Sequence, residues 1–138
     1  MLFRSWFWAN PALWRPMSAT AWIPIPDGVL SATVTAEPKD LVFATEDSVA
    51  NTGITESTTC AGPGQDWNFG WGDLASSPCS YAYRHASSTQ FGKVFEARMS
   101  IVWEMSWTSS LGIGGSLGRI TTGVPASIRV QELQALIR

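Results

Sequence analysis

A period of two between apolar and polar residues over residues 93–108 constrains the fold of this chain more than any other feature. Every second side chain of the stretch is apolar, and the residues between them include Glu96, Arg98 and Glu104. Successive side chains of a β-strand point to opposite faces of its sheet, so the pattern predicts a long, half-buried strand rather than an amphipathic helix. The side expected to cross the core consists of Phe95, Ala97, Met99, Ile101, Trp103, Met105 and Trp107.

Further alternating segments predict a fold built almost entirely of strands. Residues 30–36 alternate in the same way, Pro38 interrupts the pattern, and it resumes as LVFATE after Asp40, which predicts two strands joined by a short turn. About seven to eight antiparallel strands in two packed sheets, an all-β sandwich, are the favoured architecture, with a closed barrel as the alternative. The shorter strands are expected at 17–23, 55–60, 79–84 and 126–132, and a long Gly- and Ser-rich hairpin loop at 109–118.

The composition excludes several classes of protein. The chain has 138 residues, with 9 Lys and Arg against 11 Asp and Glu, so it lacks the positive charge of a nucleic-acid-binding domain. Charged residues make up 14% and hydrophobic residues 45%, a balance that excludes intrinsic disorder. The length is that of one domain spanning residues 1–138. No apolar run approaches the roughly 18 residues that a transmembrane helix needs.

Tryptophan is unusually frequent near the N-terminus. Four of the eight tryptophans lie within the first 22 residues. Residues 1–24 are therefore expected to form a Trp-rich strand region whose aromatic side chains act as packing anchors. Arg4 and the apolar residues after it have features of a signal peptide, but Asn10 and Pro11 interrupt the apolar stretch, so no signal sequence is visible here.

The two cysteines, Cys60 and Cys79, lie at the edges of expected strands and bound a segment rich in Gly and Pro. A disulfide between them is the favoured interpretation, and closing this loop would contribute about 3 kcal/mol in the chain-entropy model. Disulfides persist in oxidising compartments, which indicates a location outside the cytoplasm. Two buried free thiols are the alternative, and a zinc site is disfavoured because His85 is the only histidine.

The order of motifs over residues 30–108 resembles the polycystic-kidney-disease-type (PKD) branch of the immunoglobulin-like sandwiches. It runs from LSATVTAEP through LVFATED and CSYAYRHASS to VFEARMSIVWEMSW. Phe43, Tyr83 and Gly92 with Phe95 stand at positions that correspond to that family, whereas residues 45–47 replace its Gly-Asp-Gly turn. The resemblance implies an immunoglobulin-like, PKD-like fold.

Nearly the whole chain also resembles the C-terminal domain of uncharacterised secreted or envelope-attached proteins of high-GC Gram-positive bacteria. The motifs that carry this likeness are WFWANPALWRP, TCAGPG, SPCSYAYRHASS, VWEMSWT and RVQELQAL. The resemblance implies that the chain is extracellular or belongs to the cell envelope.

The sequence contains no convincing arrangement of catalytic residues. Residues 114–118 match the GxSxG pattern of hydrolases, but a nucleophilic Ser116 needs a strand-to-helix turn and a later histidine, and His85 precedes it. Glu96 and Glu104 lie about 26 Å apart along one strand, too far for a glycosidase pair. The chain is therefore expected to be no enzyme and to need no cofactor, with His85 as a surface or hydrogen-bonded imidazole.

The loop 60–79 is the best candidate for binding. Trp67, Phe69 and Trp71 alternate there and could present flat apolar faces to a protein or a glycan, or cap the end of the sandwich. Asp66 begins a partial calcium-loop pattern that lacks the final bidentate glutamate, so a metal is not expected. The sequence thus predicts a non-catalytic interaction or structural module for an unknown protein or glycan partner, with a carbohydrate-binding module as the alternative.

Overall fold

The computed structural model describes residues 4–48, 55–64 and 79–130, and in these residues the chain is built of antiparallel strands. The prediction of an all-β fold is confirmed, and two 3₁₀-helices of three residues each are the only helices in the described part. The elements are β1 (Arg4–Trp6), β2 (Met17–Ile25), β3 (Gly28–Glu46), β4 (Thr55–Cys60), β5 (Ser80–Ala82), η2 (Ser87–Thr89), η3 (Phe91–Lys93), β6 (Phe95–Ser109) and β7 (Gly114–Ile128).

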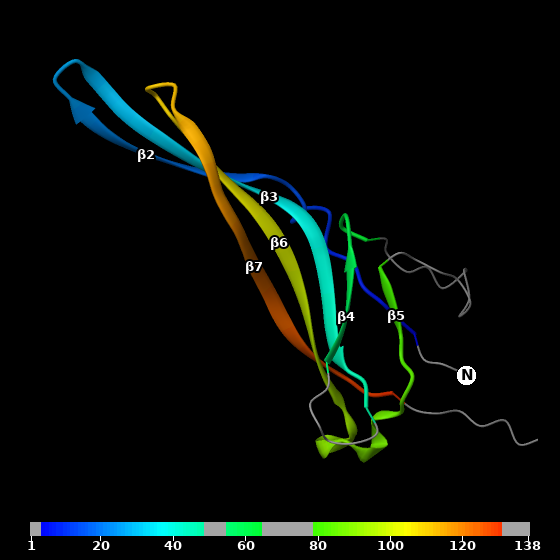
Figure 1. The fold of residues 1–138 in the computed structure, drawn as a ribbon. Coiled ribbons are helices and arrows are strands. Elements are labelled where there is room, and N and C mark those ends of the chain that lie inside the picture. Colours follow the sequence, from blue (N-terminus) through cyan, green and yellow to red (C-terminus); the bar gives the residue numbers. More distant parts are fainter. Residues whose placement is uncertain (1–3, 49–54, 65–78, 131–138) are drawn as a thin grey trace, which may run out of the picture.

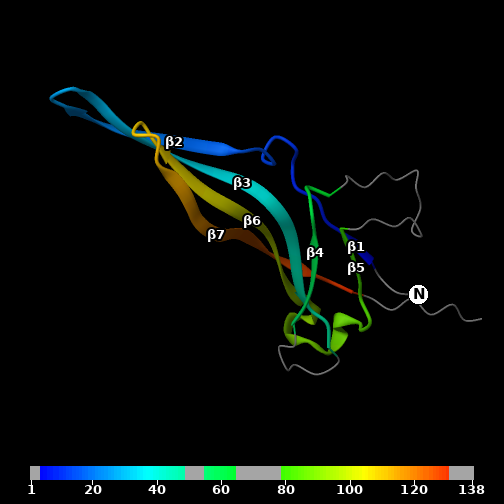
Figure 2. The same ribbon diagram turned by 45° about the horizontal axis from the view of Figure 1, so that its top comes forward.

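The strands form one large and one small sheet. The large sheet has the order β2-β3-β6-β7, and β4 pairs with the second half of β3 on the same side as β2. The small sheet consists of β1 and β5. Figure 1 shows the four long strands extending as a twisted ribbon beyond the end where β4 and β5 lie, and Figure 2 shows β1 beside β5 at that end. The large sheet is open in the described residues, with β2 and β4 along one edge and β7 along the other.

Strand β3 is continuous where the sequence predicts two strands. It runs for 19 residues and pairs with β6 from Ala32 to Thr45. Pro38 does not end the strand, because the register shifts between Pro38 and Asp40, so that Lys39 forms a bulge. Proline cannot donate a ladder hydrogen bond, and a bulge is one of the few places in a sheet that tolerate it.

Strand β7 occupies much of the segment expected to be a loop. The predicted loop 109–118 is wrong, because the turn after β6 closes with a 2.8 Å hydrogen bond from the Ser109 amide to the Ile113 carbonyl and β7 begins at Gly114. Glycine is required at this position, since a Cβ on Gly114 would collide with the carbonyl oxygen of Trp107. The strand ends at Ile128, so only residues 126–128 of the strand expected at 126–132 belong to β7, and residues 129 and 130 are not in a strand.

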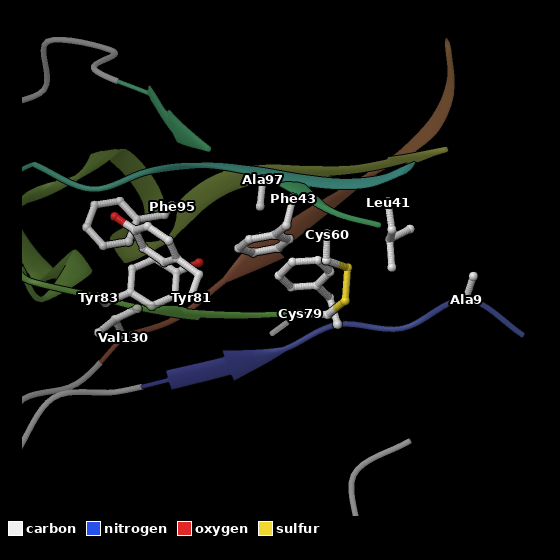
Figure 3. Packing of buried hydrophobic residues seen from close by; sticks show 11 residues of the cluster. Ala9, Leu41, Phe43, Cys60, Cys79, Tyr81, Tyr83, Phe95, Ala97 and Val130 are labelled. Carbon is white, nitrogen blue, oxygen red and sulfur yellow. A yellow bond between two sulfur atoms is a disulfide. The ribbon is translucent and has the colours of Figure 1, made fainter. Parts of the chain in front are cut away.

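The core lies between the small sheet and the nearer half of the large sheet (Figure 3). Phe7 and Phe43 stack with their ring centroids 5.2 Å apart, and Tyr83 and Phe95 stack at 5.6 Å. Tyr81 joins the two pairs, with an edge-on contact to Tyr83 at 4.9 Å. Each buried aromatic ring removes a large apolar area from water, so this column is a main part of the core between the two sheets.

Cys60 and Cys79 form the predicted disulfide, with their Cα atoms 5.5 Å apart. Both residues belong to the buried cluster, and the bond joins the end of β4 to the residue before β5 (Figure 3). It therefore links the large sheet covalently to the small one. Disulfides of this kind are typical of oxidising, extracytoplasmic environments.

Candidate functional site

The long ribbon of the large sheet has one apolar and one polar face. Residues opposite each other in antiparallel strands point to the same side, so the pairings of Val34 with Ala19 and Trp107 place these three side chains together. The same rule places Phe43 and Met99 on this side. We call this side the apolar face, and the opposite side, which carries Thr35, Ser106 and Glu104, the polar face.

The polar face carries the charges of the ribbon. Arg119 lies 3.7 Å from Asp40 and 3.6 Å from Glu104, and Lys39 pairs with Glu37 at 3.0 Å. The predicted outward positions Glu96, Arg98 and Glu104 are exposed, as expected. Ion pairs this exposed contribute little to stability, but they identify the face of the ribbon that carries its charges.

The apolar face is covered over one half of its length and open over the other. In the covered half the side chains of Leu41, Phe43 and Phe95 are buried under the small sheet. Beyond Pro38 in β3 and Trp103 in β6, the face consists of exposed or half-buried side chains. We call this surface the open half; it comprises Met17, Ala19, Ala21, Ile23, Ile25, Leu30, Ala32, Val34, Ala36, Met105 and Trp107.

Large apolar side chains in the open half are strongly exposed. Met17 is 53% exposed and Ile23 56%, and all nine residues of β2 are exposed. Scattered exposed apolar residues are ordinary, but a contiguous apolar sheet face is typical of an interaction surface. Of the tryptophans expected to be core, Trp103 is buried and donates to the Thr122 hydroxyl at 2.8 Å, whereas Trp107 is only half-buried.

A second polar cluster surrounds the buried carboxylate of Asp47 at the other end of the molecule. The carboxylate accepts four hydrogen bonds, from the Tyr81 hydroxyl at 2.5 Å, the Arg84 and His85 amides at 3.0 Å each, and the His85 ring Nδ1 at 2.9 Å. Asp47 follows β3 and the donors follow or belong to β5, so the cluster fixes the chain after β5 against the large sheet.

The electrostatics of this cluster favour an ionised aspartate. Burial alone would favour the neutral acid, but the hydrogen bonds from Tyr81, Arg84 and His85 outweigh it and hold the pKa of Asp47 below its ordinary value. Burial and the neighbouring carboxylate raise the pKa of Tyr81, which therefore stays a protonated donor. The His85 side chain is 37% exposed and hydrogen-bonded, as the sequence predicts. The arrangement is that of a structural hydrogen-bond network, in which every donor is held by the same carboxylate.

The other residues singled out from the sequence lie apart from both clusters or outside the described part of the chain. Ser116 lies within strand β7, and its hydroxyl accepts from the Gly118 amide at 3.1 Å, so GxSxG does not form a strand-to-helix turn. Trp67, Phe69 and Trp71, and the calcium-like segment that begins at Asp66, lie outside the described residues. The carbohydrate-binding alternative depends on these aromatic residues and stays a prediction.

Two features of the site were not predicted from the sequence. The role of Asp47 depends on partners more than 30 residues away along the chain, and no local motif signals it. The exposure of β2 was also missed, because a strand without any charged residue is normally expected to be buried. Within residues 4–48, 55–64 and 79–130, no three His, Cys, Asp or Glu side chains group as metal ligands.

The helices of the described residues are too short and too polar to cross a membrane. Comparison of the chain with protein-family models, curated proteins and solved structures finds no match.

Proposed function

We propose that this chain is a non-catalytic interaction module that works outside the cytoplasm and docks a protein partner through the open half of its apolar face. One observation carries the proposal: the apolar face continues well past the small sheet that covers it, while the charges of the ribbon lie on the opposite face. Exposed apolar surface of this extent costs free energy in water, and a partner that covers it removes that cost.

The proposal places the module in the cell envelope or the extracellular space. The Cys60–Cys79 disulfide supports this setting, because such bonds persist in oxidising compartments. We further propose that the two antiparallel sheets, which share an aromatic core, form a sandwich of the immunoglobulin-like, PKD type. In this proposal the covered half is the sandwich, and the ribbon is an extension that serves recognition.

Site-specific photo-cross-linking tests the proposed function. A benzophenone amino acid is introduced at Ile23, on the apolar face, or at the adjacent Trp22, on the polar face of the same strand. Both side chains are more than half exposed, 56% and 66%, so the probe fits either position without disturbing a core. In cells that export the chain, Ile23 is expected to give several-fold more cross-linked protein than Trp22. Equal yields, or cross-links from Trp22 alone, would contradict the proposal.

A further inference from the structure

We infer that the partner of the open half is a second copy of this chain, packed face to face about a two-fold axis. This inference rests on the proposed function and names its partner. Two sheets that pack face to face lie about 10 Å apart and bury their apolar sides, as the small sheet already does in the covered half. A second open half would supply the missing layer and complete a sandwich along the ribbon.

The charge distribution permits this contact. None of the residues that make up the open half is charged, so two copies can stack without burying an unpaired charge. The charged residues of the ribbon, Asp40, Glu104 and Arg119 among them, point away from the contact and stay in water. A partner with a charged surface would instead bury charges without counterions, which is costly. The face therefore fits an uncharged apolar sheet, and its own copy is one.

The area of the open half suits a weak dimer. The residues of the open half lie on three strands, β2, β3 and β6. Three strands at about 4.8 Å spacing and about eight residues at 3.3 Å give a surface of roughly 400 Å² on each copy. Two copies bury about 800 Å² together, which is below the roughly 1,000 Å² of a stable specific interface and corresponds to a weak, transient contact. A dissociation constant on the order of 10 to 100 µM is expected for such a contact.

The edges of the ribbon favour face-to-face packing over edge-to-edge pairing. Pro24 in β2 and Pro125 in β7 have no amide hydrogen to donate to a neighbouring strand. Strand β7 also has a register shift opposite Met105 and Ser106, where Gly118 adopts a φ of 85°. Prolines and bulges of this kind prevent a continuous ladder with another chain. Because the edges cannot pair, the open half is the surface that two copies can share.

Sedimentation equilibrium of the purified, disulfide-bonded chain tests the inference. The wild type is expected to show a monomer–dimer equilibrium in the micromolar range. Ala19→Glu puts a charge on the open half beside Val34, twice per dimer, and is expected to weaken dimerisation about tenfold or more. Ser18→Glu is the matched control, since the neighbouring side chain lies on the polar face of the same exposed strand, and it is expected to change the constant less than about threefold.

Three results would overturn the inference. They are a wild type that stays monomeric up to high micromolar concentration, equal weakening by Ala19→Glu and Ser18→Glu, or a dimer that neither variant weakens. The pair Ile23→Glu and Trp22→Glu repeats the comparison nearer to the turn between β2 and β3. This second pair tests the inference if Ala19→Glu fails to fold. A monomeric chain whose Ile23 cross-links to another protein would refute the second copy and leave the proposed function standing.

Discussion

Replacing Phe43 by alanine is expected to lower the free energy of unfolding by about 4 kcal/mol, the size typical of buried phenylalanines. Phe43 is buried, stacks on Phe7 and contacts Tyr81, so its ring joins the large sheet to the small one. Its loss leaves a cavity at the centre of the aromatic column. Urea unfolding followed by tryptophan fluorescence measures the change.

Val124→Ala is the matched control for Phe43→Ala. Both side chains lie on the apolar face opposite Met99, but Val124 belongs to the edge strand and is 58% exposed. Its replacement is expected to change stability by less than about 0.5 kcal/mol. A cost for Phe43→Ala close to that of the control would mean that the small sheet does not form the core with this face.

Replacing Asp47 by asparagine is expected to cost about 3 kcal/mol at neutral pH. The four donors that surround the buried carboxylate lose a charged acceptor. The NH2 group of the new asparagine is itself a donor, so it faces other donors and is left without an acceptor. Glu56→Gln is the matched carboxylate-to-amide control, since its ion pair with Arg84 at 3.6 Å is exposed and expected to contribute less than about 1 kcal/mol.

The same aspartate makes stability depend on pH in one direction. The pKa of folded Asp47 lies below its ordinary value of 3.8. The contribution of Asp47 to the free energy of unfolding is therefore fully present above pH 3.8 and is lost as the pH falls through the folded pKa. Urea midpoints measured from neutral to acid pH should therefore fall less steeply below pH 3.8 in Asp47→Asn than in the wild type. Parallel curves would show that Asp47 is not the titrating group.

The sequence predicts the strands of this fold better than their arrangement. The alternation over 93–108 identifies β6 and both of its faces, because a period of two is a local property of the chain. The prediction fails at Pro38 and at Gly114, where pairing with a neighbouring strand outweighs the local preference for a turn. The disulfide was predicted because its loop length and setting are readable from the sequence.

The candidate site could be predicted only in part, since exposure of a face depends on what lies over it. Alternation marks Phe43 and Trp107 alike as apolar positions, but only Phe43 lies beneath the small sheet. The strands that make this sheet, β1 and β5, are three residues long each. The sequence predicts a strand at 79–84, which contains β5, but no local pattern predicts that β5 pairs with β1. How much of the apolar face the small sheet covers, and therefore where the open half begins, depends on tertiary packing alone.

Hydroxyl-radical footprinting with mass spectrometry tests the central claim, docking through the open half, most directly. Ile23 and Trp22 are neighbours in β2 on opposite faces, and both are exposed in one copy of the chain. When the docked state forms, oxidation of Ile23 and of Met17 should fall several-fold, while oxidation of Trp22 stays unchanged. Equal protection of Ile23 and Trp22, or protection of Trp22 alone, would contradict the claim that partners dock on the apolar face.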